Sequence, residues 1–355
     1  MQRGLSKMKK IAIKMLVFFV AFLLLVAVAA CAQGDADTGA AYPSRDITII
    51  VPWGAGGGAD LTNRVLAEQM QTVLGVNMPV LNMPGAGGSI GLQDVFDSPR
   101  DGYRMLGTSM ASLATIDIMG LSEVSYRQWV AWKATFSPNT VAVPADSPHQ
   151  TLDDLIAAMA ANPGAVLMGS GGAGTSGHIG GLILAEVAGV TFNHIPYEGG
   201  SPAIIATMGG EVEFNTQLLS EMIDHIRSGT LRALATLSEQ PIEVIGSDGQ
   251  VIVIPSAADY VPELAAWLPL GGSNGMMVPA DSPEHVIIAL DEAFHYATQT
   301  ASVQDFAAER GMFVAGFTMA QTAEYLENIA RRVGWTLWDA GVAPVSPEEL
   351  GIPRP

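Results

Sequence analysis

The segment between residues 47 and 64 constrains the fold most, because it joins an apolar run, a glycine cluster and a helical pattern. Residues 47–51 (Ile-Thr-Ile-Ile-Val) predict a buried strand, which Pro52 ends because proline has no N–H to donate. Residues 54–58 (Gly-Ala-Gly-Gly-Gly) predict a tight turn, and Asp60 is the expected N-cap of the helix that follows. Backbone N–H groups of such a turn and helix start attract anions. The segment therefore predicts a site for a carboxylate of a small ligand.

Two other interpretations of the same glycines are open. Residues 54–59 match the pattern G-x-G-x-x-A of dinucleotide-binding folds, in which an acidic residue ends the next strand, about 20 residues on. The next apolar run, residues 78–81, is followed by Asn82 and Met83 instead, which disfavours a dinucleotide. A tight turn without any ligand is the second alternative.

The N-terminus predicts export from the cytoplasm. Residues 1–14 are basic and residues 15–30 are apolar, which is typical of a secretory signal peptide. The segment ends in Val-Ala-Ala-Cys, which resembles the lipobox of bacterial lipoproteins, so Cys31 is the expected lipidation site and residues 31–41 a flexible tether. An ordinary cleaved signal, with an incidental Cys31, and a retained transmembrane helix are the alternatives.

The charge excludes several classes of partner. Removal of the signal peptide leaves 12 of the 17 Lys and Arg residues against 35 acidic residues, a formal charge near −23. Such a chain repels nucleic acid and anionic lipid, so we expect no nucleic-acid partner. An anionic ligand must then be held by local dipoles.

Few residues suit metal or cofactor chemistry. Cys31 is the only cysteine, which excludes an intrachain disulfide, and no two histidines have the spacing i, i+4. We therefore expect no metal, no cofactor and no catalytic residue.

Apolar strands alternate with amphipathic helices, which predicts an α/β fold with mostly parallel sheets. About 310 residues exceed one hydrophobic core, so two domains are expected. Residues 79–91 repeat the order of strand, proline, glycine-rich turn and helix, with Gly85, Ala86 and Gly87 in the turn. Residues 103–107 form a third expected strand, followed by hydroxyls that include Ser109.

An internal repeat suggests where the chain passes between the domains. Val-Ala-Val-Pro-Ala-Asp-Ser-Pro at 141–148 recurs as Met-Met-Val-Pro-Ala-Asp-Ser-Pro at 276–283. Each copy predicts a strand and a turn, with a proline at the first position of a helix. We therefore expect residues 42–140 and 274–355 to form domain 1 and residues 141–273 to form domain 2. Coincidence of a common turn is the alternative.

The second domain is expected to carry its own anion-binding turn. A strand at 165–168 leads to the glycine-rich residues 169–178, in which Thr175 or Ser176 caps a helix. Further strands are expected at 192–196, which delivers Tyr197, and at 212–215, which precedes Gln217. Residues 240–260 break the pattern with an edge strand or hairpin arm, and residues 318–340 predict a helix.

The chain resembles the solute receptors of tripartite tricarboxylate transporters, also called Bug receptors. The motifs that carry the resemblance occur in order over nearly all of the chain after the tether: Tyr-Pro-Ser-Arg at 42–45, Ile-Val-Pro-Trp-Gly at 50–54 with Asp60, Asn-Met-Pro-Gly-Ala-Gly-Gly at 82–88, Asp-Gly-Tyr at 101–103, Gly-Thr-Ser-Gly-His at 174–178, Pro-Tyr-Glu-Gly-Gly at 196–200 and Leu-Arg-Ala-Leu-Ala at 231–235.

The resemblance implies a periplasmic-binding-protein-like fold of the Venus flytrap type, in which two α/β domains joined by two crossing strands close on a carboxylate. It implies no enzyme, a location on the outer side of the cytoplasmic membrane, and membrane permease subunits as partners. The ligand-binding residues that it implies lie in the turns of both domains, together with hydroxyl and amide side chains beside them: Trp53, Ala55, Gly56, Gly57, Gly58, Asp60, Gly85, Ala86, Gly87, Ser109, Ser170, Thr175, Ser176, His178, Tyr197 and Gln217.

Some positions differ from the family pattern. Trp53 stands where the family usually has Phe or Tyr, and an acidic residue often found after the third strand of the second domain is replaced around Thr216 and Gln217. For Asp60 we favour a helix cap over a ligand contact. For His178 a hydrogen-bonded helix histidine and a ligand contact are both open.

Two rival functions are open. A secreted hydrolase would use Ser176 with His178, but residues two apart at a helix start point in different directions, and residues 174–178 do not fit G-x-S-x-G. A receptor that serves signalling instead of uptake would have the same sequence features.

Overall fold

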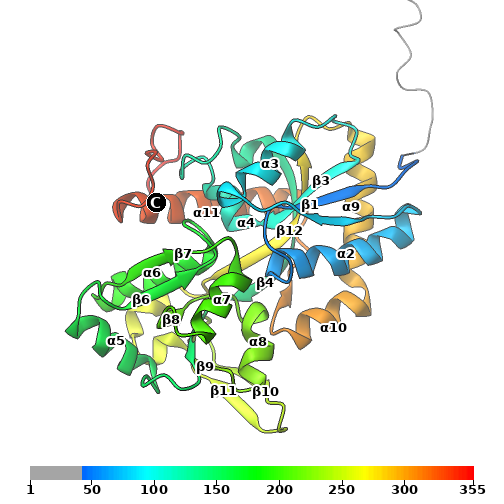
Figure 1. Cartoon of the computed structure of the whole chain (residues 1–355). Coiled ribbons are helices and arrows are strands. Elements are labelled where there is room, and N and C mark those ends of the chain that lie inside the picture. Colours follow the sequence, from blue (N-terminus) through cyan, green and yellow to red (C-terminus); the bar gives the residue numbers. More distant parts are fainter. Residues whose placement is uncertain (1–41) are drawn as a thin grey trace, which may run out of the picture. The chain divides into compact units, whose positions relative to one another are not determined.

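The computed structural model describes residues 42–355 (Figure 1). The expected signal peptide, the tether and Cys31 lie outside these residues. Residues Arg45–Pro355 form one compact unit, and every element below belongs to it. None of the described helices is both long enough and apolar enough to cross a membrane.

A six-stranded sheet with the order β13-β4-β12-β3-β1-β2 forms the first lobe. Its strands are β1 (Thr48–Val51), β2 (Val80–Asn82), β3 (Arg104–Ser109), β4 (Trp129–Pro138), β12 (Gly271–Pro279) and β13 (Phe313–Val314). Its helices are α2 (Gly58–Leu74), η1 (Ala86–Gly88), α3 (Ser89–Phe96), α4 (Met110–Thr115), η2 (Tyr126–Gln128), α9 (Glu284–Gln299), α10 (Ala301–Glu309) and α11 (Met319–Asp339).

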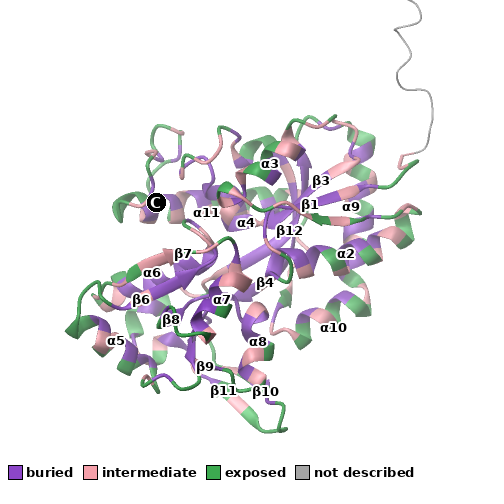
Figure 2. Cartoon of the chain, in the orientation of Figure 1, coloured by how far each residue is buried: buried purple, intermediate pink, exposed green. Residues whose placement is uncertain are grey.

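A five-stranded sheet with the order β7-β6-β8-β5-β9 forms the second lobe. Its strands are β5 (Thr140–Pro144), β6 (Leu167–Ser170), β7 (Asn193–Pro196), β8 (Phe214–Asn215) and β9 (Leu231–Thr236). Its helices are α5 (Leu152–Ala161), α6 (Ser176–Ala188), α7 (Gly200–Met208) and α8 (Leu219–Arg227). In both lobes the central strands are largely buried and the outer helix faces exposed, as Figure 2 shows in purple and green.

Both sheets are mixed, so the expectation of mostly parallel sheets is wrong. Strand β1 pairs in parallel with β2 and β3, and β6 pairs in parallel with β7 and β8. Every pairing of β4, β5 and β12 is antiparallel. These strands lie next to the passages between the lobes. Strands β5 and β12 run against the parallel strands of their sheets, whereas β4, antiparallel to β12, runs in the same direction as β1, β2 and β3.

The two passages lie side by side. Strand β4 ends at Pro138 and β5 begins at Thr140, so the chain leaves the first sheet at Asn139. The return passage meets it there, because the Asn139 N–H donates to the Leu270 carbonyl at 2.9 Å. The expected domain division, with bounds at 140/141 and 273/274, stays our proposal.

The repeated octapeptides adopt the same turn in both places. The Ser147 N–H donates to the Pro144 carbonyl at 3.0 Å, and the Ser282 N–H donates to the Pro279 carbonyl at 3.1 Å. The expected proline at the first helical position is wrong in both copies. Pro283 is the N-cap of α9, and α5 begins after Thr151, whose side chain accepts from the Asp154 N–H.

Residues 240–260 hold the expected hairpin. Strands β10 (Ile242–Ile245) and β11 (Val251–Ile254) pair antiparallel as a separate two-stranded sheet, and η3 (Ala257–Asp259) and η4 (Pro262–Ala266) follow. The expected C-terminal helix is confirmed as α11, with Thr318 as its N-cap and Ala340 as its C-cap.

Candidate functional site

A small cavity of about 50 Å³ lies between the two lobes. Its lining comes from strands, turns and helix starts of both lobes: Trp53, Gly54, Gly57, Gly58, Ala59, Ser109, Ser112 and Asn274 in the first lobe, and Gly171, Thr175, Ser176, Gly199, Gly200, Ser201, Pro202, Gln217, Leu218 and Glu221 in the second.

Several helices begin at this cavity. The N-caps of α2, α4, α6, α7 and α8 are Gly57, Ser109, Thr175, Gly199 and Leu218, and all of them line it. None of these N-caps has a side-chain hydrogen bond to its own helix. A helix N-terminus carries about half a positive charge and unsatisfied N–H groups. Their convergence makes the cavity favourable for an anion in a strongly acidic protein.

Trp53 forms a rigid wall of the cavity. Its indole N–H donates to the Thr108 hydroxyl at 2.8 Å, and the residue is 9% exposed. The second glycine turn packs behind it, since a Cβ on Gly88 would lie 3.1 Å from the indole ring. Gly88 has a φ of +94°, which favours glycine. This turn therefore supports Trp53 and does not line the cavity itself.

A β-bulge directs Asn274 toward the cavity. The register of β12 against β4 shifts between Asn274 and Gly275, a distortion that re-aims side chains. Asn274 is 2% exposed, and its amide nitrogen has no hydrogen-bond partner among residues 42–355. The buried hydroxyl oxygens of Ser109 and Ser112 also have no partner in the described chain. Unpaired buried polar groups cost about 1–3 kcal/mol each, so these three side chains are suited to contact a polar ligand.

A carboxylate of the protein already occupies part of the cavity. Glu221, in the first turn of α8, accepts a hydrogen bond from the Gly58 N–H in the other lobe at 2.7 Å. The Gln217 amide can be placed in two orientations, and only one satisfies both of its polar atoms. In that orientation its oxygen accepts from the Gly171 N–H at 2.8 Å and its nitrogen donates to Glu221 at 3.2 Å. Burial raises the pKa of the Glu221 carboxyl, and the hydrogen bond from Gly58 partly opposes this. The N-terminus of α2 thus binds a carboxylate, as the sequence predicts for a ligand, but the carboxylate shown is internal.

Asp60 is not the N-cap of α2, which corrects the expected helix start. The helix begins at Gly58, so Asp60 lies in the first turn and its carboxylate accepts from the Gly56 N–H at 2.9 Å. Its other oxygen lies 2.9 Å from both Arg64 and Asn82. Burial raises the pKa of Asp60, but these hydrogen bonds outweigh it and hold the pKa below its usual range. The side chain stabilises the glycine turn, which is close to the cap role that we favoured.

The cavity brings together part of the predicted site. The predicted residues that line it are Trp53, Gly57, Gly58, Ser109, Thr175, Ser176 and Gln217. The predicted residues outside its lining are Ala55, Gly56, Asp60, Gly85, Ala86, Gly87, Ser170, His178 and Tyr197.

His178 and Ser170 belong to a neighbouring polar cluster in the second lobe. The ring of His178 stacks on His194 at 3.8 Å, and its Nδ1 accepts from the Gly174 N–H at 3.1 Å. The hydroxyl oxygen of Ser170 lies 2.6 Å from Nε2 of His194. Burial lowers the pKa of His178 to about 3 and that of His194 to about 4, so both rings are neutral at pH 7. Tyr197 is the remaining predicted residue of the second lobe, and its hydroxyl donates to the Glu211 carboxylate at 3.4 Å.

Glu221, Asn274 and Ser201 are polar residues that line the cavity and were not predicted. Glu221 lies in a helix first turn, where an acidic residue usually only complements the helix dipole. Asn274 lies in a strand, and only the bulge turns it to the cavity. Ser112 and the glycines Gly54, Gly199 and Gly200 belong to predicted turns, but they were not singled out as ligand contacts.

Comparison with known proteins gives a consistent result. Residues 62–341 match the profile of the family described as "Tripartite tricarboxylate transporter family receptor". The chain is 29% identical over 320 residues to the protein BugT of Bordetella pertussis, which covers 86% of this chain and 92% of BugT.

Two solved structures extend the comparison. A TctC solute-binding protein from Polaromonas, without ligand, is 27% identical with a TM-score of 0.61, covering 84% of this chain and 99% of that one. MatC from Rhodopseudomonas palustris, with bound malate, is 19% identical with a TM-score of 0.75, covering 83% of this chain and 100% of MatC. The expected periplasmic-binding-protein-like fold with two α/β domains is confirmed by these likenesses.

Proposed function

The chain belongs to the tripartite tricarboxylate transporter receptor family, and we propose from this premise that it captures a small carboxylate between its two lobes and delivers it to a membrane permease. The convergence of five helix N-termini on one interlobe cavity carries this proposal. Malate in the related MatC structure supports a small organic acid as the ligand.

The expected contacts follow from the geometry of the cavity. The ligand carboxylate would accept from the backbone N–H groups at the start of α2, where Glu221 now accepts from Gly58. The unpaired side chains of Ser109, Ser112 and Asn274 would bind its remaining polar groups. Because the present cavity is about 50 Å³, a ligand requires Glu221 to withdraw or the lobes to separate.

Capture would be a hinge motion. The passages at Asn139 and Leu270 are short, and a rotation there would open the cavity while each sheet stays intact. A ligand that contacts both lobes stabilises only the closed arrangement. The permease would recognise that arrangement, and lipidation of Cys31 would hold the receptor near it at high effective concentration.

The cavity does not favour hydrolysis. Ser176 lines it, whereas His178 accepts from the Gly174 N–H and stacks on His194. A general base must reach the hydroxyl that it activates, and no hydrogen bond joins Ser176 to His178 among residues 42–355. We therefore propose a binding protein without catalysis. A receptor that reports the same closed state to a sensor is the second candidate.

A thermal-shift screen tests the proposal. The purified protein is heated with mono-, di- and tricarboxylates, and the matching amides serve as controls. A ligand that binds only the folded state raises the melting temperature increasingly as its concentration exceeds Kd. We expect shifts with one group of acids and none with its amides. A shift with esters or nucleotides alone would contradict the proposal.

A further inference from the structure

A second and larger cavity lies on another side of the lobe junction. It measures about 580 Å³, within the usual range for small-molecule sites, and it is lined from β4, α6, α11 and the residues just before β12. Ser176 is the only residue that lines both this cavity and the first one. Exposed Asn328 and Arg332 lie in its lining, so the cavity reaches solvent.

The charges around this cavity are unusual for such an acidic protein. Three basic side chains line it, Lys133, Arg331 and Arg332, and no Asp or Glu does. The chain has 35 acidic residues against 17 basic ones, so a lining whose charged residues are all basic is unexpected from its composition. A cavity of this kind attracts an anion.

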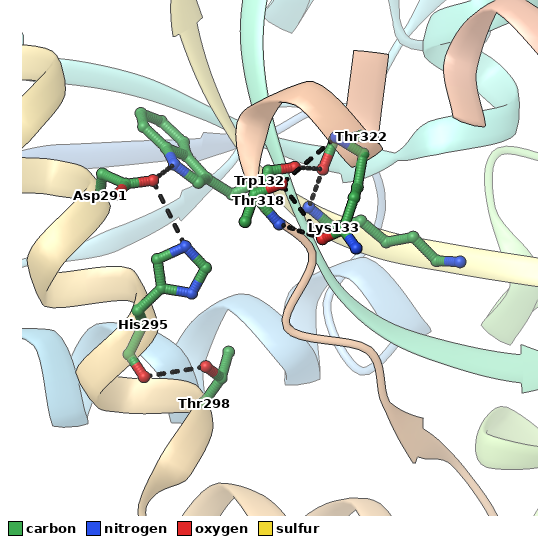
Figure 3. A network of polar contacts seen from close by, with 8 residues as sticks. Trp132, Lys133, Asp291, His295, Thr298, Thr318 and Thr322 are labelled. Atoms are coloured by element: carbon green, nitrogen blue, oxygen red, sulfur yellow. Dashed lines mark hydrogen bonds and ion pairs between the residues drawn. The ribbon is translucent and has the colours of Figure 1, made fainter. Parts of the chain in front are cut away.

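Lys133 is buried without a counter-ion. The residue is 6% exposed, and no ion pair to its ammonium occurs in the described chain. Figure 3 shows its side chain extending away from the polar network that its backbone joins through Thr322. Its Nζ lies 3.8 Å from the ring centroid of Tyr325 and 4.2 Å from that of Phe317. These rings attract the cation without neutralising it.

The ammonium keeps its charge at neutral pH. Burial lowers the pKa of Lys133 to about 8, so most molecules carry the proton at pH 7. A buried unpaired charge is costly unless something compensates it. Arg331 adds a second unsatisfied donor, because its Nε is buried without a partner among residues 42–355.

Most of the remaining lining is apolar, although Asn139, Ser176, Asn328 and Thr336 also contribute to it. Ile179 and Ile183 of α6 face Ile329 and Val333 of α11 across the cavity, and Trp267 lies at one side. A doubly charged small acid would leave these surfaces unfilled. An apolar body joined to one anionic group would fill them and place its charge near Lys133 and Arg331.

We propose that this cavity is a second binding site, for an organic anion with an apolar chain or ring, whose carboxylate is bound by Lys133 and Arg331. The site is separate from the interlobe cavity and does not depend on the function proposed for it. Because α6 belongs to one lobe and α11 to the other, occupancy of the site is linked to the arrangement of the lobes.

Titration calorimetry with octanoate tests the site, with octanamide as the neutral probe and succinate as an anion without an apolar body. We expect the purified protein to bind octanoate at least tenfold more tightly than octanamide, and succinate not to displace it. Equal binding of acid and amide, displacement by succinate, or no octanoate binding would overturn the proposal.

Variants separate this site from the first one. Lys133→Met keeps the length of the side chain and removes the charge, and we expect at least a tenfold loss of octanoate affinity with an unchanged response to the acids that bind the first cavity. Arg331→Gln gives the same test at a second, partly buried position on α11. Glu239→Ala, at an exposed acid that lines neither cavity, serves as the control that leaves octanoate binding unchanged. Unaltered octanoate affinity in both basic-residue variants would refute the assignment.

Discussion

Glu221 places a carboxylate of the protein on the N–H group that the sequence predicts to bind a ligand. Its hydrogen bond to Gly58 joins the two lobes at 2.7 Å. In the proposed binding mode a ligand carboxylate competes with Glu221 for the start of α2. The residue would then both join the lobes and limit the affinity for acids.

Glu221→Ala should bind carboxylates more tightly, because it frees the Gly58 N–H and removes a competing acid. A hydrogen bond to a charged group contributes about 1.5–3 kcal/mol, so we expect about a tenfold gain in affinity by calorimetry. The matched control is Glu239→Ala, an exposed acid outside the cavity. Weaker binding by the Glu221 variant would instead show that Glu221 contacts the ligand directly.

The stacked His178 and His194 predict a loss of stability in acid. Their pKa values of about 3 and 4 lie below the value of about 6.5 expected in the unfolded chain, so the unfolded state binds more protons below pH 6.5. The free energy of unfolding should fall as the pH drops from 6.5 toward 4. The low pKa of His178 alone should lower it by roughly 2 kcal/mol at pH 5. Melting curves from pH 7.5 to 4.5 measure this.

His178→Gln should flatten that pH dependence, whereas His225→Gln, a histidine outside the stacked pair, should leave it unchanged. A variant that loses stability equally at every pH would show that the pair acts through packing alone.

At the scale of elements, the strand, glycine turn and helix form the unit that builds the site. Two turns of the second lobe approach closely: a Cβ on Gly171 would lie 2.9 Å from both the Gly199 carbonyl carbon and the Gly200 nitrogen. Glycine at this position lets the starts of α6 and α7 line the same cavity.

Gly171→Ala should separate these two turns. We expect a destabilisation of about 1–3 kcal/mol, as for overpacked sites, and at least tenfold weaker carboxylate binding. Gly209→Ala is the control, because its nearest Cβ contact is 3.4 Å and its φ is −80°. Denaturant unfolding measures the loss of stability, and calorimetry measures the loss of affinity. A Gly171→Ala variant with unchanged carboxylate affinity would show that the site does not depend on the close approach of these turns.

The elements also show what sequence patterns can reveal. The glycine turns at 54–58 and 169–178 were predicted because glycine, proline and capping residues act locally. No strand was predicted at β4, where Lys133, Ser137 and Pro138 interrupt an apolar pattern that is nevertheless buried on both faces. The antiparallel direction of β12 and the bulge at Asn274 depend on pairing with distant strands. Local patterns do not record such pairings, and Glu221 escaped prediction because its role requires the other lobe.

At the scale of the whole molecule, charge controls encounter with the ligand. The formal charge is −18, and near −23 without the N-terminal segment. An acid is repelled at long range and bound only where the helix N-termini dominate. Salt screens the first effect far more than the second.

The association rate of a dicarboxylate should therefore rise severalfold between 10 mM and 500 mM NaCl, while the dissociation rate changes little. Stopped-flow fluorescence of Trp53, which lines the cavity, can follow the reaction. A monocarboxylate of similar size is the control, because its smaller charge should give a weaker rise. An association rate that falls with salt would show that local attraction prevails at long range too.

Lys133 is the only lysine after residue 14, and its amine lies in the wall of the second cavity. Reagents that acylate amines can therefore modify a single lysine in the described part of the chain, and they reach it only through that cavity. The rate of this covalent labelling, read as a mass increase of the proteolytic peptide that contains Lys133, becomes a measure of how often the cavity admits a small molecule. A compound that fills the cavity will protect the amine, and a compound that moves the lobes will change the rate without touching it.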